Sequence, residues 1–201
     1  MIRFIHNLAI SRRRISVLSK HIANLIPPDA TVLDVGCGKG DLSLAIKENN
    51  PDISIVGVDP LVRDNAVIKV QKFDGVMLPF RDNAFEYSIL SDVLHHTENI
   101  FDLLRETRRV SKNGIIIKDH ICSSPADLLI LRIMDAVGNR GTGVTLPYNY
   151  LSLKEWNLLF QDLGLIPDVF SGTIGLYPFP LNCLFERSLH FIALAEIKDE
   201  H

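Results

Sequence analysis

The amino-acid sequence predicts an α/β domain in which helices cover both faces of a mostly parallel sheet. Short apolar runs rich in β-branched residues alternate along the chain with segments of helical periodicity, and this alternation is typical of parallel sheets. The length of 201 residues is enough for about one domain. Hydrophobic residues make up 47% of the chain and charged residues 22%, which excludes a disordered or collagen-like chain.

Strands are predicted where apolar, β-branched runs stop at glycine, proline or an acidic residue. They cover residues 31–35, 53–58, 67–72, 85–90, 114–118, 166–171 and 189–197. Helices are predicted over residues 41–49, 99–110, 125–137 and 154–163. The last helix has the clearest ends, because Ser152 and Glu155 predict a capping box at its start and Gly164 is the glycine expected after its end.

Residues 1–28 form a basic segment, because they contain no Asp or Glu and include the arginine triplet 12–14. A helix ending before Pro27-Pro28 is predicted, with one apolar face made by Ile15, Leu18, Ile22 and Leu25. The arginines then form a solvated face. Alternatively, together with Phe4, Ile5 and Leu8, they make a weak contact with an anionic membrane surface.

Composition excludes several classes of protein. The net charge of −3 argues against a nucleic-acid partner. The three cysteines, at positions 37, 122 and 183, are odd in number and widely spaced, so neither a zinc pair nor a disulfide framework is indicated, and a reducing cytoplasm is expected. No apolar run reaches the ~18 residues of a membrane span, and the arginine triplet interrupts the stretch where a signal peptide would be apolar.

A glycine turn joins the first predicted strand to the helix at 41–49, and it reads Asp34-Val35-Gly36-Cys37-Gly38-Lys39-Gly40. Glycines at such a turn let backbone approach a ligand closely, next to the N–H groups of a helix start. The dinucleotide pattern G-x-G-x-x-G fails because Asp41 stands at its third glycine, and the P-loop pattern fails because Gly40 follows Lys39. Acids at both ends of the turn disfavour a pyrophosphate and favour a ligand with positive charge.

Two further acids follow the next predicted strands. Asp59 ends the second strand, about 20 residues after the glycine turn, where a carboxylate can accept both hydroxyls of a ribose. Asp74 follows the third strand and could accept from an adenine amino group. Taken singly, each has an alternative role, as a helix cap for Asp59 and as part of a plain turn for Asp74.

Together these motifs, with Leu78-Pro79-Phe80 and Asp92-Val93-Leu94-His95-His96 after them, resemble those of class I S-adenosylmethionine-dependent methyltransferases. The resemblance is clearest over residues 30–120. Within this family, the chain is most similar to the small methyltransferase type 11 group, which includes quinone C-methyltransferases. It implies a Rossmann-like seven-stranded sheet of order 3-2-1-4-5-7-6 with strand seven antiparallel. The domain would then comprise the basic segment 1–28, a cofactor-binding half 30–120 and an acceptor-side half 121–201.

The resemblance also implies a cofactor site. The methionine part of the cofactor would meet Gly36 and Gly38, the ribose would meet Asp59, and the adenine would meet Asp74 with the backbone of Gly75 and Val76. Ser91 would lie near the sulfonium, and Cys37 would be a small packing residue rather than a nucleophile. The full predicted set is Asp34, Gly36, Cys37, Gly38, Gly40, Asp59, Pro60, Asp74, Gly75, Val76 and Ser91.

Catalytic and acceptor-binding residues are predicted beyond the fourth strand. Candidate general bases are Asp119, His120 and His96, although Asp119 could instead be a cap and His120 a surface residue. Candidate residues of the acceptor pocket are His96, Asn139, Tyr148 and Tyr150, the last three in an irregular segment at 138–151. No metal is predicted at the histidine pair 95–96, because adjacent residues on a helix do not share a face and no third ligand is nearby in the sequence.

The activity implied is methyl transfer from S-adenosylmethionine, by in-line displacement, to a small-molecule acceptor, with quinone- or lipid-like compounds as the candidates. Nucleic-acid and protein-amide acceptors are disfavoured, because the residues after the fourth strand are Ser91-Asp92-Val93-Leu94 and not an Asn/Asp-Pro-Pro-aromatic run. Two alternatives stay open. One is a non-catalytic cofactor-binding module that acts as a partner or regulatory subunit. The other, disfavoured by Asp41, is a nicotinamide-dependent oxidoreductase.

Overall fold

The computed structural model describes the backbone of residues 2–139, 143, 146–172, 174–186 and 188–198, and their side chains outside 2–9 and 169–171. Seven strands form one sheet in the order β3-β2-β1-β4-β5-β7-β6, which confirms the expected topology. The strands β1 to β5 are parallel, and β7 runs antiparallel to both β5 and β6. Their bounds are β1 Thr31–Val35, β2 Ser54–Asp59, β3 Val70–Lys72, β4 Phe85–Ser91, β5 Ser111–His120, β6 Leu165–Ser171 and β7 His190–Ile197.

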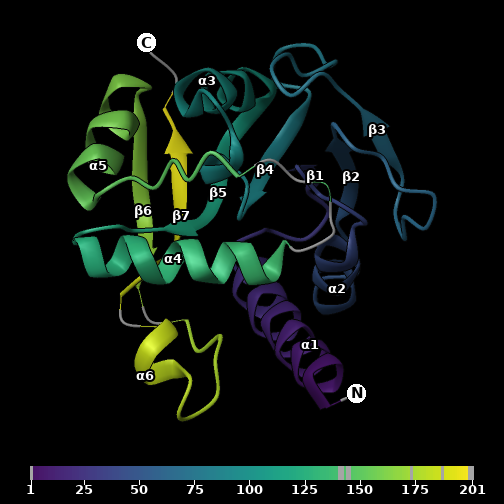
Figure 1. The fold of residues 1–201 in the computed structure, drawn as a ribbon. Coiled ribbons are helices and arrows are strands. Elements are labelled where there is room, and N and C mark those ends of the chain that lie inside the picture. Colours follow the sequence, from purple (N-terminus) through teal and green to yellow (C-terminus); the bar gives the residue numbers. More distant parts are fainter. Residues whose placement is uncertain (1, 140–142, 144–145, 173, 187, 199–201) are drawn as a thin grey trace.

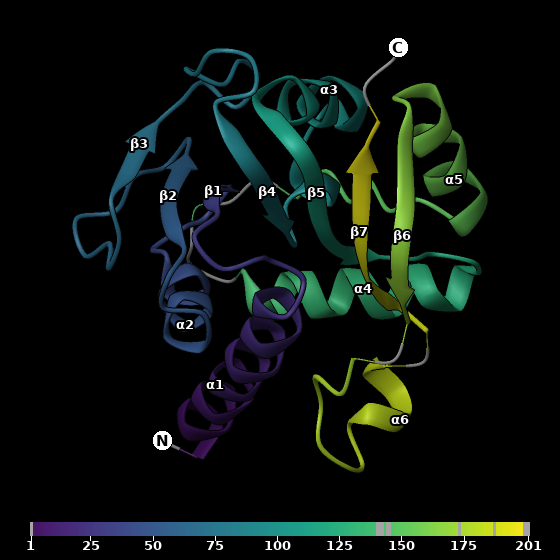
Figure 2. The ribbon, with the colours of Figure 1, turned by 180° about the vertical axis from the view of Figure 1, so that it is seen from behind.

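The helices cover both faces of this sheet, as Figures 1 and 2 show from opposite sides. Helices α3 and α5 lie on one face, α1 and α2 lie on the other, and α4 crosses below the sheet beside α1 and the short α6 (Figure 1). Their bounds are α1 Ile2–Ala23, α2 Asp41–Asn49, the 3₁₀ turn η1 Leu94–His96, α3 Ile100–Val110, α4 Pro125–Gly138, α5 Leu153–Asp162 and α6 Asn182–Phe185. None of the described helices is long and apolar enough to cross a membrane.

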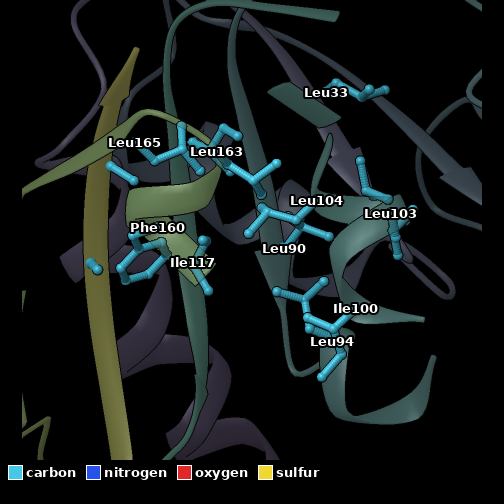
Figure 3. Close-up of a cluster of buried hydrophobic side chains, with 14 of the residues drawn as sticks. Leu33, Leu90, Leu94, Ile100, Leu103, Leu104, Ile117, Phe160, Leu163 and Leu165 are labelled. Atoms are coloured by element: carbon cyan, nitrogen blue, oxygen red, sulfur yellow. The ribbon is translucent and has the colours of Figure 1, made fainter. Parts of the chain in front are cut away.

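Each face of the sheet has its own apolar core. On the side of α3 and α5, leucines of α3 pack with Trp156 and Phe160 of α5 against β4 and β5 (Figure 3). On the side of α1 and α2, Leu18 and Ile22 of α1 pack with Ile46 of α2. Burying a side chain of this kind stabilises the fold by roughly 1.5–3 kcal/mol, so the apolar face predicted for residues 15–25 is what holds α1 on the sheet.

Element ends agree with the predictions to within one residue except at three places. The third strand is shorter than predicted, because the backbone N–H of Val67 donates to the carbonyl of Lys39 in the glycine turn instead of joining the sheet. The fifth strand is longer, since β7 pairs with it as far as His120. The first helix ends at Ala23, before Pro27, in a turn where Leu25 donates to Ile22. The capping box at Ser152 and the positive φ of 61° at Gly164 are confirmed.

Candidate active site

The glycine turn is held against β2 by its own backbone. The N–H groups of Gly36 and Cys37 donate to the carbonyl of Val58 at 2.8 and 3.2 Å. Gly36, Gly38 and Gly40 all have positive φ, which side chains disfavour, and a Cβ on Gly36 would lie 2.6 Å from the side chain of Val93. Above Gly38, by contrast, a Cβ would meet nothing within 4 Å. The turn is therefore tightly packed behind and open in front, as a ligand cradle requires.

Two side chains support the turn from behind. Asp34 is 3% exposed and accepts a hydrogen bond from the Ser43 hydroxyl of α2, and burial raises its pKa to about 7. Cys37 packs its thiol against Gly57, where a Cβ would collide with the sulfur, and burial raises the pKa of that thiol. Both residues belong to the predicted cofactor-binding set, and the packing of Cys37 agrees with its predicted role as a small packing residue. The contacts of both side chains shape the turn. A protonated, packed thiol is also a poor nucleophile.

Asp59 links the second strand to the turn. One carboxylate oxygen accepts from the backbone N–H of Gly38 at 2.8 Å, and the other accepts from the N–H of Leu61 at 2.8 Å. A carboxylate has about four acceptor sites, so two remain for the hydroxyls of a ribose. Pro60, directly after it, is exposed.

Asp74 is fixed in the same manner at the exposed end of β3. A single oxygen of its carboxylate accepts from the N–H groups of Val76 and Met77, each at 2.8 Å, and these bonds lower the pKa of the carboxyl group. Gly75 lies between them with a φ of 89°, and Val76 is 55% exposed. Two fixed carboxylates and an open glycine turn fit an adenosine that carries a positively charged sulfonium.

The end of β4 has different chemistry. Asp92, one residue after Ser91, forms ion pairs with Lys118 of β5 and with Arg14 of α1, the latter at 3.0 Å. Lys118 is fully buried, and burial lowers the pKa of its ammonium despite the nearby Asp92. Burial alone would raise the pKa of Asp92, but Lys118 and Arg14 hold it well below its usual range. We call Arg14, Asp92 and Lys118, with the adjoining His120 and His190, the charge network.

The charge network corrects the interpretation of the basic segment. Arg14 turns inward to Asp92 and to the hydroxyl of Tyr177, and Arg13 donates to the carbonyl of Gly175 at 3.0 Å. Arg14 therefore binds within the fold, so the predicted solvated face is wrong for it, whereas Arg12 and Arg13 are exposed as predicted. The side chains of Phe4, Ile5 and Leu8 lie outside the described part of the chain.

The predicted bases Asp119 and His120 lie beneath the surface. Asp119 is 1% exposed and accepts from the N–H groups of Leu94 and His120 and from the ring of His95. His120 is 3% exposed, and burial together with Lys118 lowers its pKa well below the usual range, so its ring is neutral. Asp119 therefore caps the start of η1 through the N–H of Leu94, as the alternative interpretation had it, whereas His120 is not the exposed residue of that interpretation. Asp119 positions η1. His120 lies between the charge network and the polar residues around η1.

A second polar group, which we call the histidine cluster, surrounds η1 and contains His95, His96, Asp119, Asp135 and Tyr150. One ring nitrogen of His95 lies 2.6 Å from Asp119, and the other lies 3.4 Å from Asp135 of α4. Tyr150 donates to Asp135 and stacks on His95. The expectation that no third ligand accompanies the histidine pair is thus wrong, because α4 brings Asp135 beside both rings. The signal was absent from local sequence, since 39 positions separate the two segments.

The remaining predicted acceptor residues lie around this cluster. Asn139 ends α4 and donates to the carbonyl of Asp135 at 3.2 Å. Tyr148 has a φ of 60°, and the guanidinium of Arg132 lies over its ring, 5.2 Å from the ring centroid. Arg140 and Gly141 lie outside the described residues. The irregular segment therefore folds back on η1, where Asn149 donates to the carbonyl of Thr97 at 2.7 Å.

A cavity of about 530 Å³ opens on the other side of α4. Ser91 and Asp92 form its polar end, and α1, α4 and residues 177–185 provide mostly apolar walls, among them Leu18, Ile133, Met134 and Tyr177. The lining does not include His96, Asn139, Tyr148 or Tyr150. The walls formed by α1 and by residues 177–185 were not predicted, because these segments reach the cavity only through the fold.

The comparisons with known proteins agree with the fold. A family model described as a methyltransferase domain matches residues 7–166. An uncharacterized methyltransferase of Schizosaccharomyces pombe is 27% identical over 129 residues, covering 55% of this chain and 45% of that protein. The chain thus spans under half the length of this curated relative.

Solved structures share the fold. The structure of a methyltransferase in complex with the Haloferax volcanii Trm112 activator has a TM-score of 0.69 at 16% identity, covering 96% of this chain and 94% of that one. A SAM-dependent methyltransferase from Methanosarcina mazei has a TM-score of 0.61 at 18% identity, covering 89% and 97%. The chain thus shares its fold with S-adenosylmethionine-dependent methyltransferases, and because the family model spans most of its length, this protein belongs to the methyltransferase-domain family.

Proposed function

We propose that the protein transfers a methyl group from S-adenosylmethionine to a small, largely apolar acceptor bound in the cavity beside α4. The observation that carries this proposal is the cavity itself, which joins apolar walls to Ser91 and Asp92 at the end of β4. Ligands of open α/β sheets bind outside the carboxyl ends of the strands. The acceptor would then approach the methyl group from the side opposite the glycine turn.

The chain's own residues would hold the cofactor by its adenosine. The carboxylates of Asp59 and Asp74 would accept from the ribose hydroxyls and the adenine amino group, and the open face of Gly38 would admit the methionine part. When bound, the sulfonium supplies a methyl carbon whose bond to sulfur breaks as the bond to the acceptor forms, leaving a neutral thioether. Holding such reactants in line can contribute ~7–11 kcal/mol.

Asp92 is the acidic group best placed to meet the acceptor. It lines the cavity, its side chain is 24% exposed, and its pKa stays well below the usual range. An ionised carboxylate at this point would accept a hydrogen bond from an acceptor hydroxyl or amine and orient it. Because the sulfur leaves as a neutral group, a strong base is not required for departure, and the buried Asp119 and His120 would act by positioning.

An apolar acceptor is supported by α4. Its residues Leu129, Ile133 and Val137 lie four positions apart and are 61%, 50% and 57% exposed. Such a stripe on one helix face is unusual on a surface that meets only water. Ile133 and Val137 also line the cavity. A quinone- or lipid-like acceptor would cover the part of this stripe formed by Ile133 and Val137, and a weak membrane contact through residues 1–28 would lie on the neighbouring helix.

The first test is calorimetry with S-adenosylmethionine, S-adenosylhomocysteine and NAD. We expect micromolar binding of the two sulfur compounds and none of NAD. Asp59→Ala should weaken binding by about 10–100-fold, because hydrogen bonds to a charged group contribute ~1.5–3 kcal/mol each. Asp64→Ala, a change at a nearby exposed aspartate, is the control. Binding of NAD instead would restore the oxidoreductase alternative.

The second test concerns the acceptor. Methyl transfer would be measured from labelled cofactor to a panel of quinones, phenols and isoprenoid compounds. Ile133→Glu should raise the KM for the acceptor and leave cofactor affinity unchanged, whereas Leu129→Glu, on the same stripe but outside the cavity lining, should change neither. Cofactor binding without transfer to any acceptor class would favour the partner-subunit alternative, in keeping with a solved neighbour that is bound to an activator.

A further inference from the structure

The histidine cluster contains two buried ring nitrogens that make no hydrogen bond of ordinary geometry. Nδ1 of His96 has no hydrogen-bond partner, and Nε2 of His95 has only the long contact of 3.4 Å to the Asp135 carboxylate. His95 is 1% exposed, so water does not satisfy its nitrogen from outside. A buried polar atom without a partner costs about 1–3 kcal/mol, and an unpartnered nitrogen beside a weakly bonded one points to a common partner.

A carboxylate completes the arrangement. One ligand atom each from His95, His96 and Asp135 lies within 4.8 Å of the other two, and the rings of the two histidines have centroids 4.0 Å apart. Two imidazoles and one carboxylate are a common ligand set for Zn²⁺ and for Fe²⁺. The three atoms are close enough for side-chain rotations to bring them around one ion.

The surroundings resemble the outer shell of a metal site. The ring nitrogen of His95 that faces away from Asp135 is bonded to Asp119 at 2.6 Å, which is the carboxylate–histidine arrangement that orients metal ligands. Tyr150 donates to the carboxylate of Asp135 and would hold it in place in the same way. With these two bonds in place, Nε2 of His95 and the carboxylate of Asp135 face each other, 3.4 Å apart.

Charge favours a cation at this centre. The ion pairs that Asp119 and Asp135 make within the described chain are both with His95, so two carboxylates share one histidine. A divalent ion bound to neutral histidines would balance both. The other set of possible ligands, Asp92, His95 and His120, is a poorer site, because Lys118 and Arg14 already neutralise Asp92.

We propose that His95, His96 and Asp135 bind a divalent transition-metal ion of the Zn²⁺ type, which ties α4 to the end of β4. Asp135 comes from α4 and the histidines come from η1, directly after β4. The same helix presents Ile133 and Met134 to the acceptor cavity. The ion would therefore fix one wall of the cavity, as a structural site with no part in the methyl transfer itself.

The test is a titration of chelator-treated protein with Co²⁺, whose visible absorption reports histidine ligation, followed by displacement with Zn²⁺. We expect one ion per chain and an increase in Tm, because an ion that binds only the folded state stabilises it. Asp135→Asn and His96→Gln should each weaken binding by more than tenfold. Asp119→Asn should weaken it by about 10–100-fold through the orientation of His95.

Glu98→Gln is the matched control, since this residue is two positions after His96 and exposed. If Asp135→Asn fails to fold, His96→Gln decides the result, because His96 is half-buried and tolerates a polar replacement more readily. Lack of binding by the folded protein, or equal binding by every variant, would overturn the proposal. A proton on His95, shared by the two carboxylates, would then be the partner.

Calorimetry with S-adenosylmethionine is independent of this readout, so failure of the metal site and failure of the proposed function can be told apart.

Discussion

The glycine turn and the charge network lie at the carboxyl ends of neighbouring strands, but they are built in opposite ways. In the glycine turn, one backbone N–H group bonds to a carboxylate 21 positions away, and two more bond to a backbone carbonyl. In the charge network, side chains bond to side chains, with 78 positions between Arg14 and Asp92 and 72 between Lys118 and His190. A site made from backbone is specified by a local motif. A site made from buried side chains depends on the whole fold, and its removal should therefore affect stability more.

The largest expected effect tests this difference directly. Asp92→Ala would leave the buried Lys118 without its carboxylate, which should lower the free energy of unfolding by about 3–5 kcal/mol. The double variant Asp92→Ala with Lys118→Met should recover part of the loss, because it removes the unpaired charge. Urea unfolding measures both. Asp59→Ala, in the glycine turn, should cost less than about 1.5 kcal/mol, and an equal loss there would break the comparison.

An intermediate effect is expected from the pH dependence of Asp34. Its folded-state pKa of about 7 is above the usual 3.8, so the folded protein binds a proton that the unfolded chain releases. Stability should therefore fall as pH rises from about 4 to 7 and level off above that range. In Asp34→Asn this contribution is absent, and the variant should gain on the order of 3 kcal/mol relative to wild type between pH 4 and 8.

Urea unfolding at several pH values checks this expectation. Asp162→Asn, at the exposed end of α5, controls for the loss of one negative charge. A stability difference that stays constant with pH would mean that Asp34 ionises freely in the fold.

The smallest effect concerns backbone geometry. Gly40 has a φ of 85°, and a Cβ there would collide with Ile68. Gly40→Ala should cost about 1–2 kcal/mol from the left-handed conformation alone, and it should weaken cofactor binding because the turn must shift. Gly138→Ala, at the end of α4, meets nothing within 4 Å and should be neutral or slightly stabilising. Thermal unfolding and calorimetry separate the two variants, and equal behaviour would show that the turn is not strained.

What could be predicted from the sequence follows the same division between local motifs and side chains that the whole fold brings together. The order of all seven strands and the placement of Asp59 and Asp74 were predictable, because each depends on a motif at the end of a strand. The inward turn of Arg14 and the partnership of Asp135 with the histidine pair were not predictable. They require α1 and α4 to be docked first, and nothing near residue 14 or 135 in the sequence records the partner. The three-residue η1 was missed because it is shorter than any helical period.

The position of β7 affects how the chain is completed during synthesis. Among the described strands, β6 pairs with β7 alone, yet it precedes β7 along the chain by the whole of α6 and its flanking turns. When β6 leaves the ribosome it has no strand to join, and the edge of β5 is open at the same time. Unpaired edges promote association with other chains. The length of chain between β6 and β7 therefore sets the interval during which the nascent protein is most exposed to aggregation. Shortening this segment, or slowing its translation, should change the yield of folded protein more than its final stability.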